Sequence, residues 1–302
     1  MRNLIIIGGP TAVGKTELAI WLAKKLKTNI ISADSRQIYK ELNIGVARPS
    51  EEELSTIKHY FIATKSVKDY YNASMYEQEA LQLINQLFKK KENIIVVGGS
   101  GLYIDAIVKG IDDIPSVLAG IRNSLFVWYK EQGIEKLRKL VKNLDPNYYS
   151  KADLNNPMRL LKALEVTIQT TKPYTSFLNG QKKKRAFKII MIGLDRQRGE
   201  LYNRINKRVL KMIENGLVEE VKSLVPYRNY TALNTVGYKE IFDYLDDKIS
   251  LEQAIDLIQR NSRKYARRQL SWFRRYKDIV WFNPEEKTKI WDFIIKKISK
   301  FE

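Results

Sequence analysis

The chain has 302 residues, 44% of them hydrophobic and 11% aromatic, which is enough apolar material for one large domain or two modest ones. Lysine and arginine (53) outnumber aspartate and glutamate (34), so the formal net charge is +19. A polyanion is therefore the expected partner, nucleic acid before an anionic membrane surface. With no cysteine and one histidine, His59, a structural disulfide and any zinc site built from Cys and His ligands are excluded.

The first predicted element is a buried strand from Leu4 to Ile7, and helical periodicity follows from Glu17 to Leu26. The apolar run is too short for a signal-peptide core or a membrane span, so we expect a cytoplasmic protein with no membrane association. The loop between them matches G-x-x-x-x-G-K-[ST] in the strand, loop and helix context that this phosphate-binding motif requires. The residues expected to bind a diphosphate are Gly9, Pro10, Thr11, Ala12, Val13, Gly14, Lys15 and Thr16.

The chemistry of this loop follows from its residue types. Glycines let backbone N–H groups converge on one anion, the helix N-terminus adds positive potential, Lys15 supplies a mobile cation, and Thr16 offers a ligand for Mg²⁺. The motif does not say which molecule carries the diphosphate. A small-molecule kinase that uses ATP and an RNA-binding NTPase are therefore alternatives that the loop alone leaves open.

Two further strands are predicted to end at the same edge of a parallel sheet. The strand 29–33 leads into Asp34, and the strand 93–97 leads into a Gly-Gly-Ser-Gly turn that includes Ser100. Because open α/β folds form their sites at the carboxyl ends of parallel strands, we expect Asp34 to face the phosphate loop. The alternatives for Asp34 are a helix cap and a kinase-type Mg²⁺ partner.

The middle of the chain interrupts this alternation. Helical patterns dominate from Ile121 to about Thr170, and a strand resumes at Phe187. We therefore predict an α/β fold with a P-loop NTPase-like core, a parallel sheet flanked by helices, divided as core 1–112, helical insertion 113–186 and core 187–302. The basic run Lys182–Arg185 is either a linker or a phosphate-backbone contact. Within the insertion, Arg159, Lys162 and Glu165 are predicted to share one helix face.

The segment 251–276 is predicted to be an amphipathic helix with a cationic face. Its opposite side, which includes Tyr265, is predicted to pack on the core. Because no acidic residue interleaves with the cations, the face indicates an anionic partner, although a solvated face is the alternative. Its seven cations are Arg260, Arg263, Lys264, Arg267, Arg268, Arg274 and Arg275.

Seven sequence strings resemble the landmarks of the tRNA dimethylallyltransferases, also called isopentenyl-tRNA or IPP transferases, in that family's order. The resemblance implies a Mg²⁺-dependent transfer of a prenyl group from dimethylallyl diphosphate to N6 of the adenosine 3′-adjacent to the anticodon. It covers nearly the whole chain, although Val46 and Arg48 stand where Thr and Lys are usual. The strings are GPTAVGKT (9–16), ADSRQIY (33–39), GGSGLYIDA (98–106), RLLKALEV (159–166), GLVEEV (216–221), VGYKE (236–240) and YARRQLSWFRR (265–275).

The resemblance also implies roles for individual residues. Asp34 would be the general base, Ser100 would contact donor and acceptor, and Lys15 would stabilise the leaving diphosphate, for which Arg204 and Arg208 are further candidates. The expected partners are dimethylallyl diphosphate and the anticodon stem-loop of tRNA, bound by a monomer. A kinase leaves the cationic helix unexplained, and an NTPase switch gives residues 34–37 no role. Together with the cationic helix, the predicted tRNA contacts are Asp34, Ser35, Arg36, Gln37, Ser100, Arg122, Arg159, Lys162, Arg263 and Arg267.

Overall fold

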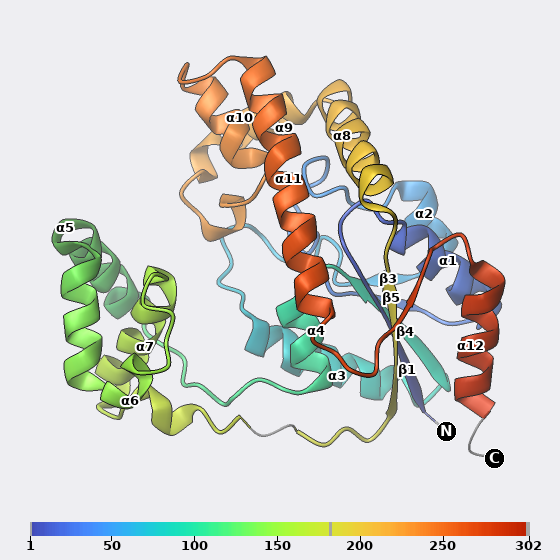
Figure 1. Ribbon diagram of the computed structural model, residues 1–302, viewed down its shortest axis with the longest axis horizontal. Coiled ribbons are helices and arrows are strands. Elements are labelled where there is room, and N and C mark those ends of the chain that lie inside the picture. The colour runs from blue at the N-terminus through green and yellow to red at the C-terminus, as the bar shows by residue number, and fades with distance from the viewer. Residues whose placement is uncertain (1, 181–182, 300–302) are drawn as a thin grey trace. The chain divides into compact units, whose positions relative to one another are not determined.

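The computed structural model describes residues 2–180 and 183–299, and the chain divides into two compact units (Figure 1). The larger unit comprises Met1–Val108 and Lys184–Glu302, and the smaller unit comprises Lys109–Lys183. The sequence places these boundaries a few residues later, after 112 and after 186. None of the described helices combines the length and the apolar character needed to cross a membrane.

The larger unit is built on a six-stranded sheet with the order β3-β2-β4-β1-β5-β6 among the described residues. Every neighbouring pair in it is parallel, which agrees with the predicted α/β class. The central strand β1 pairs along its full length with β4 on one side and β5 on the other. The strands are β1 (Asn3–Gly8), β2 (Ile30–Ser32), β3 (His59–Tyr60), β4 (Asn93–Gly98), β5 (Lys188–Leu194) and β6 (Val280–Phe282).

Successive side chains of β1 enter different cores, because strand side chains alternate between the two faces of a sheet. Leu4 and Ile6 pack in the core that α3 and α4 help to form, and Ile5 and Ile7 pack in the core that α1 and α12 help to form. This double burial explains the continuous apolar run in the sequence. The helices of the unit are α1 (Lys15–Lys25), α2 (Glu51–Thr56), α3 (Ala73–Leu87), α4 (Gly101–Val108), α8 (Arg198–Glu214), α9 (Leu217–Ser223), α10 (Tyr238–Leu245), α11 (Leu251–Phe273) and α12 (Lys287–Ser299).

The smaller unit consists of helices around their own core. Its elements are α5 (Ala119–Leu144), α6 (Pro146–Tyr149) and α7 (Pro157–Thr170), followed by a 3-10 turn. Gly133 has a φ of 77°, a left-handed conformation that interrupts the helical geometry of α5. The buried Asp145 caps α6 through the N–H of Tyr148 (2.9 Å) and also accepts the N–H of Thr175 (2.8 Å).

The predicted polar face of α7 is only partly correct. Arg159 is exposed, but Glu165 is buried, and its carboxylate accepts a hydrogen bond from Nε of Arg122 at 3.2 Å. Arg122, a predicted tRNA contact, is thus engaged with an acidic side chain of its own unit. The prediction was wrong for Glu165 because its basic partner, Arg122, lies on another helix, and helical spacing along α7 cannot show that partner.

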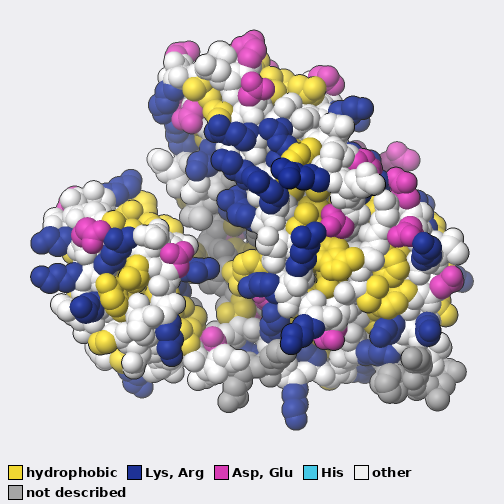
Figure 2. Space-filling model, viewed as in Figure 1, with side chains coloured by type: hydrophobic (Ala, Val, Ile, Leu, Met, Phe, Trp, Pro, Cys, Tyr) yellow, Lys and Arg dark blue, Asp and Glu magenta, His cyan; other side chains and the backbone are white. Residues whose placement is uncertain are grey.

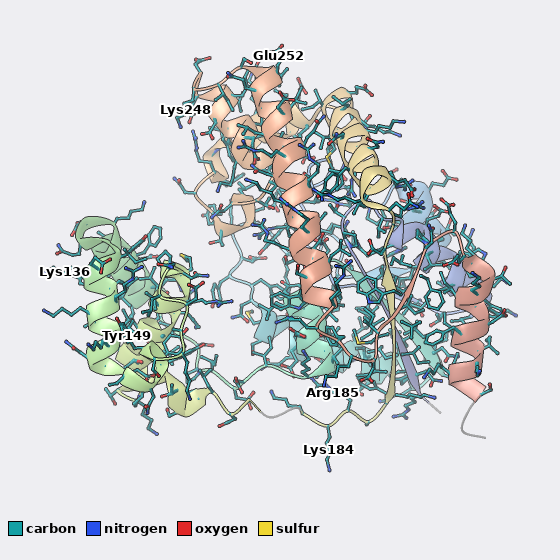
Figure 3. The ribbon with its side chains drawn as sticks, viewed as in Figure 1. Lys136, Tyr149, Lys184, Arg185, Lys248 and Glu252 are labelled. Atoms are coloured by element: carbon teal, nitrogen blue, oxygen red, sulfur yellow. The ribbon has the colours of Figure 1, made fainter. Side chains whose placement is uncertain are left out.

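Backbone contacts join the two ends of the smaller unit. The N–H of Lys183 donates to the carbonyl of Lys109 at 2.8 Å. Directly after it, Lys184 points away from the ribbon, whereas Arg185 lies beneath α3 and α4 (Figure 3). Arg185 forms a buried ion pair with Glu77 at 2.9 Å and donates to the carbonyls of Ala106 and Ile107, both at 2.7 Å. Arg185 is therefore a structural anchor, neither linker nor phosphate contact, while Lys182 lies outside the described residues.

Candidate active site

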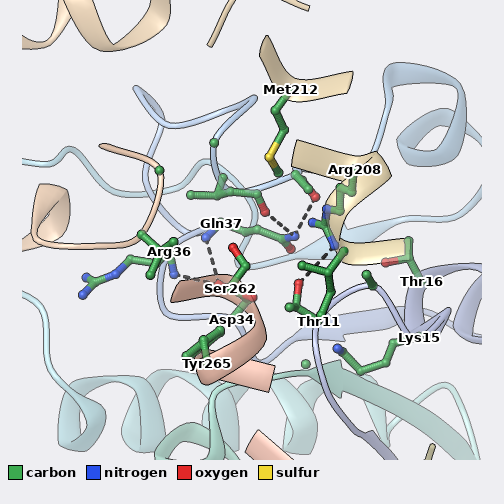
Figure 4. Close-up of a pocket in the computed structure, with 18 of the residues that line it drawn as sticks. Thr11, Lys15, Thr16, Asp34, Arg36, Gln37, Arg208, Met212, Ser262 and Tyr265 are labelled. Atoms are coloured by element: carbon green, nitrogen blue, oxygen red, sulfur yellow. Dashed lines mark hydrogen bonds between the residues drawn. The ribbon is translucent and has the colours of Figure 1, made fainter. Parts of the chain in front are cut away.

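A cavity of about 840 Å³ lies in the larger unit at the carboxyl ends of the central strands. Its wall includes the phosphate loop, the turn after β2, one side of α8 and one side of α11 (Figure 4). This is the position at which open parallel sheets bind ligands. Thr11, Lys15, Asp34, Arg36 and Gln37, all predicted from the sequence, line this one cavity.

The phosphate loop places Lys15 in a position that favours its neutral form. The Nζ atom of Lys15 donates to the carbonyls of Gly9 (3.0 Å) and Pro10 (2.7 Å). Burial of the ammonium lowers the pKa of Lys15 to about 7; the negative charge of Asp34 opposes this effect, and the positive charge of Arg208 adds to it. An anionic ligand in the cavity would therefore restore the charge on Lys15.

Three arginines form hydrogen bonds to the phosphate loop. Arg204 donates from Nε to the carbonyl of Ala12 at 2.9 Å, and Arg208 donates to Oγ1 of Thr11 at 3.1 Å. The structure thus brings both predicted arginines of α8 to the loop. Arg196, which the sequence analysis missed, donates from Nε to the carbonyl of Val13 at 3.0 Å.

Arg196 is fixed by acidic partners and is itself buried. Its guanidinium pairs with Glu200 and, at 2.7 Å, with Glu285, and its side chain is 6% exposed. Burial alone would lower the pKa of Arg196, but the hydrogen bonds and charges of Glu285 and Glu200 together raise it above its usual value. The one signal in the sequence was the four-residue spacing from Glu200, which is common on any helix.

Asp34 faces the loop across the cavity. Its Oδ1 accepts the N–H groups of Arg36 (2.9 Å) and Gln37 (3.3 Å), which fixes the carboxylate within a turn. The segment after it is a turn and no helix, so the alternative of a helix cap does not apply. Burial lowers the pKa of Arg208, as it does that of Lys15, and the charge of Asp34 opposes this effect at both groups.

Ser100 lies behind the cavity wall. It is buried, and its hydroxyl accepts the N–H of Ser35 at 2.8 Å and donates to the hydroxyl of Ser35 at 3.1 Å. Ser35 lines the cavity directly and Ser100 bonds to it from behind, so the contact of Ser100 with donor and acceptor stays a prediction. Its two hydrogen bonds to Ser35 also hold the turn that follows Asp34.

The prediction that Tyr265 packs in the core was wrong. Its ring lines the cavity near Asp34 (Figure 4). Burial is the main cause that raises the pKa of Tyr265 to about 12; the charge of Asp34 adds to this effect, and a hydrogen bond with Ser100 opposes it. The amphipathic pattern of α11 cannot distinguish an aromatic residue that lines a cavity from one that fills a core.

The loop 44–48 lines another part of the cavity and is held at several points. Gln37 donates its amide to the carbonyls of Val46 (3.2 Å) and Ala47 (2.9 Å). Glu220 of α9 accepts the N–H groups of Ile44 (2.7 Å) and Gly45 (3.1 Å). Since Gln37 binds a backbone carbonyl of Val46, this bond does not depend on the unusual side chain there.

The cationic face of α11 is partly free and partly paired. Basic side chains gather over this helix in Figure 2. Arg267 and Arg268 are exposed, whereas Arg263 donates to Oδ1 of Asn206 at 2.6 Å. Arg274 and Arg275 pair with Asp195 and Asp105 at 3.2 and 3.3 Å. The expectation that the seven cations lack acidic partners was therefore wrong for these two, because the acids come from distant segments.

A second, shallower cavity lies on the outer side of α11. Lys264, Arg267, Arg268 and Arg275 surround Trp272 there, and the guanidinium of Arg275 lies 3.9 Å from the centroid of the indole ring. Cations interleaved with an aromatic ring suit a nucleic-acid strand, whose phosphates and bases take complementary positions. Arg268 lines both cavities, so the two are neighbours.

The residues of the cavity fit a Mg²⁺ ion held mainly by its substrate. Thr16 and Asp34 carry oxygen atoms of the kind that Mg²⁺ prefers and line the same cavity. Within the described residues there is no group of three or more His, Cys, Asp or Glu side chains that could hold a metal. Because Mg²⁺ keeps several waters and binds substrate phosphates, a few protein oxygens suffice.

A parallel sheet whose central strand leads into a phosphate loop, with a lysine and a carboxylate in the cavity beyond it, defines an α/β enzyme for a phosphorylated substrate. The chain belongs to the IPP transferase family, whose model matches residues 37–276. The resemblance seen in the sequence strings is thereby confirmed, and so is the predicted fold class.

Relatives and solved structures cover almost the whole chain. The tRNA dimethylallyltransferase 1 of Bacteroides thetaiotaomicron is 50% identical over 294 residues, 97% of this chain and 96% of that protein. The tRNA dimethylallyltransferase of Christiangramia forsetii is 50% identical over 301 residues, 99% and 100% of the two chains. The tRNA isopentenylpyrophosphate transferase of Bacillus halodurans has a TM-score of 0.72 at 33% identity, with 99% and 97% covered. A eukaryotic dimethylallyltransferase acting on tRNA has a TM-score of 0.79 at 25% identity, with 94% and 74% covered.

Proposed function

We propose that this protein transfers the dimethylallyl group of dimethylallyl diphosphate to N6 of the adenosine 3′-adjacent to the anticodon of tRNA, releasing diphosphate. The observation that carries the proposal is the pairing of a diphosphate loop with Asp34 in one cavity, beside the exposed arginines of α11. The names of the relatives, tRNA dimethylallyltransferases at 50% identity, support it. We expect a monomer to bind both substrates.

The donor side stabilises the leaving group. As the bond between the prenyl carbon and oxygen breaks, negative charge builds on the diphosphate, and preorganised positive groups lower the barrier. Lys15 and Arg208 line the cavity beside the N–H groups that begin α1. A Mg²⁺ ion bound through Thr16 would neutralise further charge on the diphosphate. Each such group contributes several kcal/mol at most, so we expect their joint loss to abolish transfer.

Apolar side chains beside this anion site suit the prenyl fragment. Val46, Val209, Met212, Val236 and Ile258 line the same cavity as Lys15. An allylic cation forming among them would meet few water molecules, which favours transfer over hydrolysis. Polar side chains, among them Glu53, Asn234 and Ser262, line other parts of the cavity. The choice between dimethylallyl diphosphate and ATP therefore rests on the assay below.

The acceptor side removes a proton. The adenine amine is a weak nucleophile because its lone pair is delocalised into the ring, so a carboxylate that accepts its proton helps as the new bond forms. Oδ1 of Asp34 is held by two backbone N–H groups, and within the described residues no hydrogen bond to Oδ2 occurs. Oδ2 is therefore the atom for the proton. Arg36 and Tyr265 lie in the same wall and suit a flipped nucleotide.

The test is a direct assay. The full chain is incubated with Mg²⁺, unmodified tRNA and either dimethylallyl diphosphate or ATP, and the nucleosides are analysed by mass spectrometry. We expect the mass of adenosine to increase by one prenyl group when dimethylallyl diphosphate is the donor, and not when ATP is. Hydrolysis or transfer from ATP without any prenylated adenosine would overturn the proposal in favour of a kinase or an NTPase.

A further inference from the structure

Gln269 connects three segments that are distant in the sequence. It is 5% exposed, near the C-terminal end of α11. Its Oε1 accepts the N–H of Thr11 in the phosphate loop at 2.8 Å, and its Nε2 donates to the carbonyl of Gly99 after β4 at 2.9 Å. One side-chain amide thus bonds to the loop that faces the donor and to the turn that supports Asp34.

The surroundings leave little freedom for this amide. A Cβ atom added at Gly99 would lie 2.1 Å from Nε2 of Gln269, so a side chain at that position would displace the amide. A buried amide also requires partners for its donor and its acceptor, and the two hydrogen bonds supply them. The position of Gln269 is therefore determined by both neighbours together.

The hydrogen bond to Thr11 determines which N–H groups of the phosphate loop are available to an anion. Pro10 has no N–H, and the N–H of Thr11 is occupied by Gln269, so the N–H groups from Ala12 onward remain to bind an anion. Pro10 and Thr11, both predicted diphosphate ligands, thus support the loop through other bonds. Gln269 fixes the point at which the anion-binding part begins.

The same helix presents the acceptor side of the cavity. Tyr265 lies four residues before Gln269, one helical turn away, and Arg268 is its direct neighbour; both line the cavity. A displacement of the loop relative to α11 would change the distance between the donor and a nucleotide bound by these residues. Misplacement of reacting groups by about 1 Å is enough to cost about a hundredfold in rate.

We propose that Gln269 is a positioning residue that sets the separation between the donor diphosphate and the acceptor nucleotide by tying the phosphate loop to α11. This inference rests on the proposed function, because it assumes that the loop binds the donor and that α11 faces the acceptor. Gln269 also lines the cavity, and it acts through its hydrogen bonds to Thr11 and Gly99. Its loss impairs donor binding and turnover and leaves RNA binding intact.

The first experiment removes the two hydrogen bonds. Gln269→Met keeps the length of the side chain without either bond, and Gln259→Met makes the same change at a half-buried glutamine of α11 outside the cavity. We measure the Kd of inorganic pyrophosphate with Mg²⁺, the Kd of an anticodon stem-loop, kcat and KM. For Gln269→Met we expect a pyrophosphate Kd about tenfold higher, kcat at least about tenfold lower and an unchanged stem-loop Kd. Gln259→Met should match the wild type.

The outcomes separate the inference from the function on which it rests. If the wild type binds no pyrophosphate, the proposed function fails. If the wild type binds it and Gln269→Met has the same pyrophosphate Kd and kcat, the inference is overturned. Equal losses of stem-loop and pyrophosphate binding together with a lower melting temperature would also overturn it, because they indicate a general fold defect.

A second experiment tests the contact between Gln269 and Gly99 by changing Gly99. Gly99→Ala forces the amide away, whereas Gly99→Ala in a Gln269→Ala background has no amide to displace. We expect Gly99→Ala to lower kcat at least about fivefold alone and to have little further effect in the double variant. Additive losses in the double variant would contradict a role through this contact.

Discussion

Asp34 and Lys15 line one cavity from opposite walls, and the carboxylate raises the pKa of an ammonium that burial otherwise lowers. The pair separates two tasks in the proposed reaction. Lys15 is suited to the negative charge that builds on the donor, and Asp34 to the proton that leaves the acceptor. Their proximity also means that a change to one alters the electrostatics of the other.

Replacement of Asp34 by asparagine tests the proton transfer. Asn keeps an oxygen for the N–H groups of Arg36 and Gln37, so the turn is retained while the charge and basicity are lost. We expect a fall in kcat of about a hundredfold or more with little change in the Kd of the anticodon stem-loop. Single-turnover assays with both substrates saturating measure the effect. Equal loss of stem-loop binding would show that Asp34 is architectural.

The lowered pKa of Lys15 predicts proton uptake on donor binding. In the free protein, Lys15 loses its charge as the pH rises above about 7. A bound diphosphate adds negative charge next to Nζ and raises that pKa, so Lys15 gains a proton when the ligand binds. The affinity for pyrophosphate should therefore fall as the pH increases above about 7.

Calorimetry in buffers of different ionisation enthalpy checks the proton count. Lys15→Arg is the matched control, because arginine stays protonated at every pH of the experiment. The protons that the ligand itself exchanges are common to both proteins, so the difference between them reports Lys15. Identical proton uptake by the two would contradict the prediction.

The exposed and the paired arginines of α11 should differ in their contribution to RNA binding. Arg267 is exposed, whereas Arg274 pairs with Asp195. We expect Arg267→Gln to weaken stem-loop binding several-fold and to reduce the slope of log Kd against log salt by about 1. Arg274→Gln is the matched control and should change the slope less. Binding titrations at several salt concentrations measure both slopes. Equal slopes for the two variants would contradict the expected difference between exposed and paired arginines.

The buried ion pair of Glu77 and Arg185 should matter for stability. Removal of one partner leaves the other charge buried, which typically costs about 3–5 kcal/mol. Arg185→Met should therefore lower the free energy of unfolding by about 3 kcal/mol in urea titrations. Lys184→Met, at an exposed neighbouring position, should have little effect. The result would be contradicted if the two variants were equally stable.

The sequence was enough to predict the features that depend on residues close to one another along the chain. The loop 9–16 is a continuous motif, and Asp34 follows a strand, so the rule for parallel sheets was enough to place the two together. Gln269 and Arg196 were missed because their partners in the loop lie 258 and 183 residues away along the chain. A buried glutamine in an amphipathic helix gives no local signal of such a bond.

The wrong predictions for side chains of α11 have one physical cause: periodicity along a helix contains no information about other elements. Helical periodicity tells which side of α11 faces the protein, but not whether core or cavity lies there, and Tyr265 shows the difference. Spacing along one helix also reveals nothing about acids on other elements. Asp195 and Asp105 therefore escaped notice as partners of Arg274 and Arg275.

The bond between Lys183 and Lys109 brings the two ends of the helical unit within 2.8 Å of each other. A chain that departs and returns at one point can be shortened there with a brief glycine-rich connection, at small cost in loop-closure entropy. The sheet and its cavity should then fold without residues 109–183. Such a protein should still bind pyrophosphate, because the residues that line the cavity all belong to the larger unit.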